Sequence, residues 1–246
     1  MARTDRKTSR KKSGARPADP PGQRLWQRVR RLVLRAALGL VALVLVLTVL
    51  FTVVNPPVTY TIWSESRRLG GVDRDWVAIE AIAPVMARSA VAAEDANFCL
   101  HWGIDVAAVR QAIDGGGQRG ASTITQQVVK NVFLWQGRSW LRKALETAIT
   151  PVVELIWSKR RILEIYLNLA EMGPGVFGVE AAARHHFGTT AAKLSPTQAA
   201  RIAAILPAPR SRSAGKPTSA VRSRAAQIMD GAATIRADGR AACFED

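Results

Sequence analysis

The longest apolar run in the chain lies near its N-terminus, where nineteen residues from Ala36 to Val54 carry no charge. In a helix, such a run is about 28 Å long, close to the thickness of a bilayer's hydrocarbon core. A cleavable signal peptide has a shorter apolar segment and a small-residue cleavage site, whereas Asn55-Pro56-Pro57 follows here. The pattern therefore predicts a transmembrane helix over residues 36–54.

Beyond this span the pattern changes to a series of short amphipathic helices. They are predicted at residues 79–94, 106–113, 124–133, 140–172 with an interruption at Pro151, 179–187 and 196–206. Asp105 is a candidate N-cap, and Thr123 with Gln126 fits a capping box, as does Ser195 with Gln198. An alternating segment, Val58–Trp63, could form a short strand or an extended linker. We predict a mainly α fold without internal repeats.

Charge is concentrated just before the apolar span. Residues 1–35 hold twelve Lys or Arg against two Asp, in a chain whose net charge is +16. Such an arm by itself is typical of nucleic-acid or membrane-surface binding. Because an apolar span follows it, we interpret the arm as a cytoplasmic topology signal that also touches anionic lipid. No nucleic-acid partner is expected, and residues 58–246 face the outside of the plasma membrane.

The predicted helix 124–133 has a polar face formed by Gln126, Gln127, Lys130 and Asn131. It could be an ordinary solvated surface. It could also bind an anion, because the free N–H groups and the dipole of a helix start favour negative charge.

The helix that begins at residue 140 has two different faces. We expect the core to receive its apolar stripe, which consists of Leu141, Leu145, Ala148, Val152 and Leu155. Arg142, Lys143 and Glu146 lie opposite this stripe. They could form routine ion pairs or a cationic clamp for a phosphate with a carboxylate beside it.

Two adjacent acids, Glu94 and Asp95, follow an apolar stretch. Neighbouring side chains on a helix point about 100° apart, so one acid should face the interior or a cleft while the other caps or pairs. A buried carboxylate is either a structural partner or a proton-transfer group with a raised pKa.

The cysteines and histidines predict no metal site. Cys99 and Cys243 are far apart in sequence, and the three histidines do not make a ligand set. A disulfide could form in an oxidising compartment, but nothing in the sequence requires one.

Taken together, five blocks in a fixed order resemble glycosyltransferase family 51, the peptidoglycan glycosyltransferases, in their monofunctional form. The blocks are EDANFCLHWGID (94–105), GASTITQQVVKN (120–131), RKALE (142–146), RILEIYLNLAEMGPGVFGVEAAARHHFG (161–188) and LSPTQAARIAAILPAP (194–209). Ala121 stands where many relatives have glycine. The expected organisation is a basic cytoplasmic arm (1–35), a transmembrane helix (36–54), a glycosyltransferase domain (58–210) and a basic, Ala-rich C-terminal tail (211–246).

The resemblance implies a lysozyme-like helical domain with a small hydrophobic jaw close to the membrane. It implies that Glu94 is the catalytic base and Glu146 a second essential glutamate. It also implies substrate contacts by Ser122, Thr123, Gln127, Lys130, Asn131, Arg142 and Lys143. Residues 132–140, with Phe133, Leu134, Trp135 and Trp140, could belong to the jaw or to the core.

The implied reaction polymerises lipid II into β-1,4-linked glycan strands with release of undecaprenyl diphosphate, and we expect no transpeptidase domain. No cofactor is certain, although Mg²⁺ or Mn²⁺ could accompany the pyrophosphate. The expected partners are lipid II, the growing glycan chain, membrane lipids and other cell-wall synthesis or division proteins. The expected location is the bacterial inner membrane, with the catalytic domain on the periplasmic side. A lytic enzyme of related fold and an inactive membrane-tethered scaffold are the alternatives.

Overall fold

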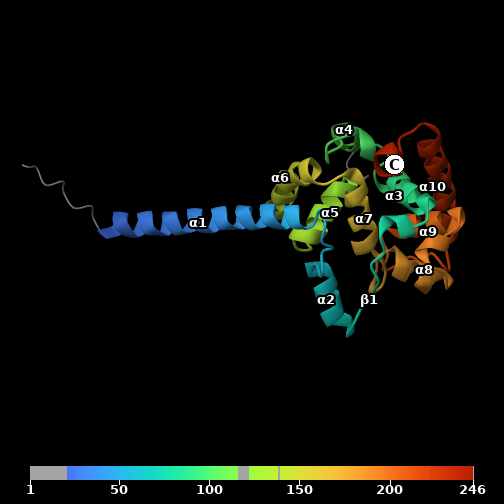
Figure 1. The fold of residues 1–246 in the computed structure, drawn as a ribbon, viewed down its shortest axis with the longest axis horizontal. Helices are drawn as coiled ribbons and strands as arrows, with labels where there is room; N and C mark the ends of the chain where they lie inside the picture. Colours follow the sequence, from blue (N-terminus) through green and yellow to red (C-terminus); the bar gives the residue numbers. More distant parts are fainter. Residues whose placement is uncertain (1–20, 116–121, 138, 246) are drawn as a thin grey trace, which may run out of the picture. The chain divides into compact units, whose positions relative to one another are not determined.

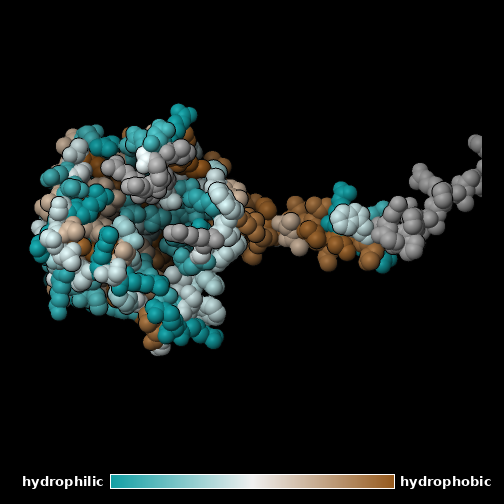
Figure 2. Space-filling view, turned by 180° about the vertical axis from the view of Figure 1, so that it is seen from behind, coloured by the Kyte–Doolittle hydropathy of each residue, from teal (hydrophilic) through white to brown (hydrophobic). Residues whose placement is uncertain are grey.

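The computed structural model describes residues 21–115, 122–137 and 139–245, and the chain divides into two compact units with a boundary between Val46 and Leu47. Helix α1 (Pro21–Leu50) supplies the described part of the first unit up to Val46, and its last turn belongs to the second unit. Its segment Leu25–Leu50 has a mean hydropathy of 2.6 and is long and apolar enough to cross a membrane. Most apolar side chains of this helix are exposed, as Figure 2 shows. The helix begins before the expected residue 36 and ends before Val54, and its length and composition fit a single membrane anchor.

The second unit is mainly helical, as predicted (Figure 1). Its helices are α2 (Tyr60–Leu69), α3 (Pro84–Glu94), α4 (Val106–Asp114), α5 (Ile124–Phe133), α6 (Trp140–Ile156), α7 (Lys159–Leu169), α8 (Val179–Phe187), α9 (Pro196–Ile205), α10 (Ser219–Ala237) and α11 (Ala242–Glu245). Three 3₁₀ turns are η1 (Ile79–Ala81), η2 (Phe98–Leu100) and η3 (Ala191–Lys193). A small sheet has the order β1-β3-β2, with β1 (Asp73–Arg74) parallel and β2 (Glu171–Gly173) antiparallel to β3 (Val176–Phe177).

The helices pack as two groups that share one core. In one group α5 contacts both α6 and α7, and in the other α3, α9 and α10 contact one another (Figure 1). Fully buried apolar side chains join them, among them Met86 of α3, Ile124 of α5 and Ile202 of α9. Helix α10 follows residue 210, so much of the predicted tail belongs to the second unit.

Local capping explains why several predicted helices begin where they do. Thr123 and Gln126 form both hydrogen bonds of a capping box at the start of α5, and Ser195 does the same with Gln198 at α9. Asp105 Oδ1 accepts from Ala108 N at 2.8 Å, as expected of an N-cap at α4.

Several predicted element boundaries were wrong. The helix predicted at residues 79–94 is the 3₁₀ turn η1 followed by α3, which begins only at Pro84. The segment Val58–Trp63 is not a strand, because Thr59 N-caps α2 by accepting from Ile62 N at 3.3 Å. Pro151 does not interrupt α6. It has no backbone N–H group to donate, and because it lies on an exposed face, water can bind the carbonyl that would have accepted. The helix ends at Ile156, and Ser158 caps α7, which itself ends at Leu169 instead of residue 172.

The predicted core-facing stripe of α6 was also wrong. Leu141 and Leu155 are 66% and 75% exposed, Ala148 is exposed, and Leu145 and Val152 are half-buried. The buried face instead carries Glu146, Thr150, Val153 and Glu154. Polar partners explain this inversion, because Glu154 accepts hydrogen bonds from Thr125 Oγ1 at 2.5 Å and from Lys159 Nζ at 2.8 Å.

The two cysteines are joined in a Cys99–Cys243 disulfide. It links η2 to α11 across 144 residues of sequence. The sequence had left this pairing open.

The end of α1 is part of the second unit. Trp157 Nε1 donates to the Thr48 carbonyl at 2.6 Å, and Arg161 donates to the carbonyls of Phe51 and Val54 at 3.0 Å each. The Phe51 ring also lies 6.4 Å from that of Phe133. Residues 47–54 therefore pack as a piece of the globular unit.

Candidate active site

A cavity of about 840 Å³ opens between the end of α3, the start of α5 and the first turns of α6. Figure 2 shows a largely hydrophilic hollow on this face of the second unit. The cavity is lined by Ala93, Glu94, Ser122, Gln126, Gln127, Lys130, Arg142, Lys143, Glu146, Leu206, Pro207 and Arg224. A second cavity of about 590 Å³ shares Gln127, Lys130, Leu206 and Pro207 with the first.

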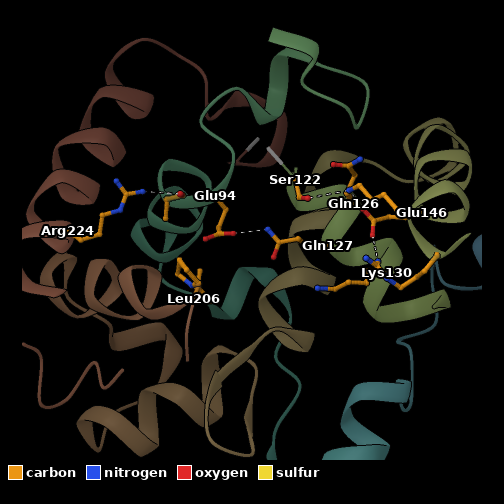
Figure 3. Close-up of a pocket in the computed structure, with 12 residues that line it drawn as sticks. Glu94, Ser122, Gln126, Gln127, Lys130, Glu146, Leu206 and Arg224 are labelled. Carbon is orange, nitrogen blue, oxygen red and sulfur yellow. Dashed lines mark hydrogen bonds and ion pairs between the residues drawn. The ribbon is translucent and has the colours of Figure 1, made fainter. Parts of the chain in front are cut away.

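Glu94 is the last residue of α3, and its carboxylate points into the cavity toward Gln127 (Figure 3). Gln127 Nε2 donates to Glu94 Oε2 at 2.7 Å. Burial raises the pKa of Glu94, and the hydrogen bond from Gln127 and the charges of Arg224 and Lys130 oppose that rise without cancelling it. Glu94 is therefore a half-buried carboxyl group with a raised proton affinity at the edge of a polar cavity.

Asp95 turns away from the cavity, as expected of the second of two neighbouring acids. Its Oδ2 accepts from Ile124 N at 3.0 Å, which satisfies a free N–H group at the start of α5. Its Oδ1 lies 2.8 Å from His101 Nε2. His101 Nδ1 accepts from Gly103 N at 3.1 Å, so Nε2 carries the proton and donates to Asp95. Asp95 thus connects α3 to α5.

Across the cavity, α6 presents a buried carboxylate between two cations. Glu146 is only 3% exposed, and it accepts from Arg142 Nη1 at 2.6 Å and from Lys143 Nζ at 2.5 Å. Spacings of three and four residues place all three side chains on one face of the helix. Because the Lys143 side chain is 40% exposed, its charge remains available to a ligand in the cavity.

Lys130 of α5 adds a third cation to this wall. Burial lowers its pKa, Arg142 and Lys143 lower it further, and Glu146 opposes them. Within the described part of the chain, its ammonium group makes no hydrogen bond or ion pair. A cation held close to two others without a partner is suited to an anionic ligand.

Of the remaining predicted site residues, some line the cavities and one caps α5 without reaching a cavity. Ser122 lines the first cavity and accepts from Lys143 Nζ at 3.4 Å. Asn131 lines the second cavity and accepts from Gln136 Nε2 at 3.3 Å. Thr123 is buried and lines neither cavity, because its hydroxyl donates to the Gly103 carbonyl and caps α5. Gly120 and Ala121 of the second block lie outside the described residues.

Sequence reasoning missed one charged residue of the cavity, Arg224 of α10. It lies on the Glu94 side and donates to the Ala93 carbonyl at 3.2 Å (Figure 3). No local signal marks it, because it is 130 residues from Glu94 and looks like one of many basic residues in the tail. Only the buried neighbours Val221, Ala225 and Ile228 indicate that this helix packs against the domain.

The cavity does not fit a divalent cation held by the protein. Mg²⁺ on a substrate phosphate is usually held by one or two carboxylates, and the carboxylates that line the described cavity are Glu94 and Glu146. Both oxygens of Glu146 are already paired with cations. We therefore derive no step that passes through a metal.

Comparisons with known proteins identify the family of this chain. Residues 63–233 match the family model described as Transglycosylase. The chain is 58% identical over 244 residues to a biosynthetic peptidoglycan transglycosylase of Jannaschia sp. (strain CCS1), which covers 99% of each chain. It is 45% identical over 229 residues to a protein of the same description from Rhizobium meliloti (strain 1021), covering 91% of this chain and 96% of that one.

This chain belongs to the peptidoglycan transglycosylase family. As a member it is a glycosyltransferase of cell-wall synthesis, as the five blocks indicated. The family match runs past residue 210 and includes Arg224.

Proposed function

We propose that this glycosyltransferase polymerises lipid II, the disaccharide-pentapeptide carried on undecaprenyl pyrophosphate, into β-1,4-linked glycan. One observation carries this proposal: a carboxylate with a raised pKa and a group of three cations face the same cavity. The first suits the activation of a hydroxyl group, and the second suits a leaving pyrophosphate.

In this reaction Glu94 is the general base. The 4-hydroxyl oxygen of the incoming lipid II attacks the anomeric carbon of the growing chain, and its proton passes to Glu94. The bond from that carbon to the pyrophosphate oxygen breaks, and configuration inverts. The hydroxyl group is a weak nucleophile until its proton is removed, so a positioned base contributes about 10²–10⁴-fold.

The negative charge that develops on the departing pyrophosphate is offset by Lys130, Arg142 and Lys143. Cations fixed before the reaction stabilise such charge without reorganisation during the step. We assign Glu146 the role of holding Arg142 and Lys143 in place, because each of its oxygens is bonded to one of them.

Two adjoining cavities support the use of two substrates. They share Gln127 and Lys130, which lie between the Glu94 side and the wall formed by α2 and β2. Asn131 lines only the second cavity, so we place its contact there. Holding both lipids on one membrane surface removes much of the entropic cost of bringing them together.

Helix α1 supports a single-pass topology. We propose that the basic N-terminus is cytoplasmic and the catalytic unit periplasmic, because Lys and Arg residues next to a span favour the cytoplasmic side. Membrane lipids and other cell-wall synthesis proteins would then be partners at the periplasmic face of the inner membrane.

The test is incubation of the purified protein with labelled lipid II, followed by separation of glycan polymer and digestion with muramidase. The wild type should make muramidase-sensitive polymer, and Glu94→Gln should lose about 10²–10⁴-fold in rate while staying folded. Full activity of Glu94→Gln between about pH 6 and 8 would remove Glu94 from this role.

The same assay separates the alternatives. Cleavage of preformed glycan without polymer synthesis would identify a lytic enzyme. Absence of both reactions in folded, membrane-inserted protein would favour a scaffold. The three cations argue against the lytic alternative, because cutting a glycosidic bond needs an acid and no cationic clamp.

A further inference from the structure

The C-terminal segment of the described chain contacts the loop that follows Glu94 and precedes α4. This loop comprises residues 95–103. Cys243 forms a disulfide with Cys99 inside it, and Arg240 Nη1 donates to the Ala96 carbonyl at 3.0 Å. Two contacts of different chemistry therefore reach the same stretch of backbone from the chain's end.

The segment itself is fixed to the rest of the unit. The Phe244 ring is buried, with its centroid 6.3 Å from that of Phe98. Arg160 Nη1 of α7 donates to the Phe244 carbonyl at 2.9 Å, and Arg88 of α3 pairs with Glu245 at 2.6 Å. A segment bonded to α3 and α7 can hold the loop still with respect to both helix groups.

Both ends of the loop form hydrogen bonds with residues at the start of α5. At one end Asp95 Oδ2 accepts from Ile124 N at 3.0 Å, and at the other the Gly103 carbonyl accepts from Thr123 Oγ1 at 2.6 Å. Glu94 immediately precedes the loop, and its partner Gln127 lies one turn into α5. Movement of the loop would therefore shift the catalytic carboxylate and α5 relative to each other.

We propose that the Cys99–Cys243 disulfide is a positioning element of the active site. It holds the 95–103 loop and thereby keeps Glu94 in a fixed position relative to the N-terminus of α5. The disulfide touches no reacting atom and acts through Asp95 and Gly103 at the ends of the loop. Nothing in the sequence required this disulfide. The activity readout below rests on the proposed function, whereas the exchange readout does not.

A disulfide that spans 144 residues also stabilises the fold by restricting the unfolded chain. Thermal stability alone therefore cannot distinguish a positioning role from a purely stabilising one. The deciding measurements are made well below the melting temperature of every variant, where all of them are folded.

The experiment compares the full-length wild type in detergent with Cys99→Ala/Cys243→Ala. Its first readout is hydrogen exchange of the Ile124 amide, which should speed up in the variant because the Asp95 acceptor is less firmly held. Its second readout is steady-state polymerisation of labelled lipid II. We expect kcat to fall about tenfold and KM to change less than about twofold, because a misplaced base costs turnover and not binding.

Reduction of the wild type should reproduce the variant. A dithiol such as dithiothreitol transfers two electrons and two protons, so that Cys99 and Cys243 become thiols and the reagent becomes a cyclic disulfide. The kcat of the wild type should fall after this treatment, and that of Cys99→Ala/Cys243→Ala should not change.

Two further variants keep the test decisive. Arg240→Gln removes the hydrogen bond to Ala96 and leaves the disulfide intact, so its kcat and Ile124 exchange should shift in the same direction by a smaller amount. The stability control is Leu194→Ala, a buried residue just before α9 and outside the loop. It should lower the melting temperature without changing kcat or the Ile124 exchange.

Wild-type kcat and wild-type Ile124 exchange in both the double variant and Arg240→Gln would overturn the proposal and leave the disulfide as a stabilising cross-link. If the oxidised wild type makes no glycan, the proposed function fails instead. The exchange comparison would then still show whether the disulfide holds the loop.

Discussion

Glu94 is expected to lower the stability of the folded protein at neutral pH. Its pKa is raised by burial, so between the ordinary carboxyl pKa and the raised one the native state binds more protons than the unfolded state. Stability should therefore fall as the pH rises through this window and stay lower above it.

Glu94→Gln removes this cost while its amide oxygen can still accept from Gln127. The variant should melt at a higher temperature than the wild type at pH 7, and the difference should vanish at about pH 3, where the carboxyl group is protonated in both states. Calorimetric scans over this range provide the measurement. A Glu94→Gln variant less stable than the wild type at pH 7 would show that the carboxylate is a net structural partner.

The cations of α6 should affect turnover through the leaving group. We expect Arg142→Ala or Lys143→Ala to lower kcat by about 10²-fold, the size of effect seen when one preorganised donor is removed. The measurement is polymerisation rate together with lipid II affinity, with Lys193→Ala, an exposed lysine of η3, as the matched control. Wild-type polymerisation rates and lipid II affinity in folded variants would show that these residues serve only as ion-pair partners of Glu146.

At the residue scale, the sequence predicted what depends on local geometry. The different roles of Glu94 and Asp95 were predicted from their 100° offset. The structure places Glu94 in the cavity, whereas Asp95 accepts a hydrogen bond from the start of α5. Arg224 could not be found in this way, because its approach to Glu94 depends on how α10 packs against α3.

At the scale of elements, helix starts marked by a capping box were predictable and the orientation of α6 was not. A capping box is formed by residues three apart, so Thr123 and Ser195 marked the starts of α5 and α9 directly. Which face of α6 is buried depends instead on partners in other helices. Thr125 of α5 and Lys159 of α7 bond to Glu154 on its polar face. Periodicity gives the faces of a helix and not the side that is buried.

The inverted α6 leaves an apolar face that a membrane could cover. Trp140, Leu141 and Leu155 are 91%, 66% and 75% exposed. Tryptophan and leucine side chains on a helix surface bind at the lipid interface. In a chain that begins at Leu47, Trp140→Ser/Leu141→Ser should weaken binding to vesicles at least about tenfold, given roughly 1.5–3 kcal/mol for each large apolar side chain.

Phe133→Ser is the informative comparison for this face. The Phe133 ring lies 6.4 Å from Phe51 and 6.2 Å from Trp157, so we assign it to the core rather than to a jaw. This variant should lose thermal stability, whereas the α6 double variant should keep it. Unchanged vesicle binding by the folded double variant would exclude this face as the membrane contact.

At the scale of the whole molecule, the mainly α class and the apolar N-terminal helix were predictable from the pattern, but the extent of the catalytic unit was not. The tail appeared to be a basic appendage because α10 is rich in alanine and arginine. Its alanines allow it to pack closely against α3, and Gly231 lies so near Ala92 that an added Cβ would be 3.3 Å from that residue's methyl group. Small residues give little hydrophobic signal even where they are buried.

The anchor and the catalytic unit meet within α1, and this determines where a soluble form should begin. The compact unit begins at Leu47, and Thr48, Phe51 and Val54 make contacts within it. A chain that begins at residue 55 loses all of them. It leaves Trp157 Nε1 without its acceptor and uncovers one side of the Phe133 ring.

We therefore expect residues 55–246 to be less stable than residues 47–246 by about 3 kcal/mol, the lower end of the cost of deleting a buried Phe side chain. For a unit of this size the melting temperature should fall by roughly 6–12 °C. Trp157→Phe in the longer form separates the two contributions, because it removes the hydrogen bond to Thr48 and retains an aromatic ring beside Phe133. It should lose about 1 kcal/mol. Equal melting temperatures for the two truncated forms would show that residues 47–54 act as part of the anchor alone.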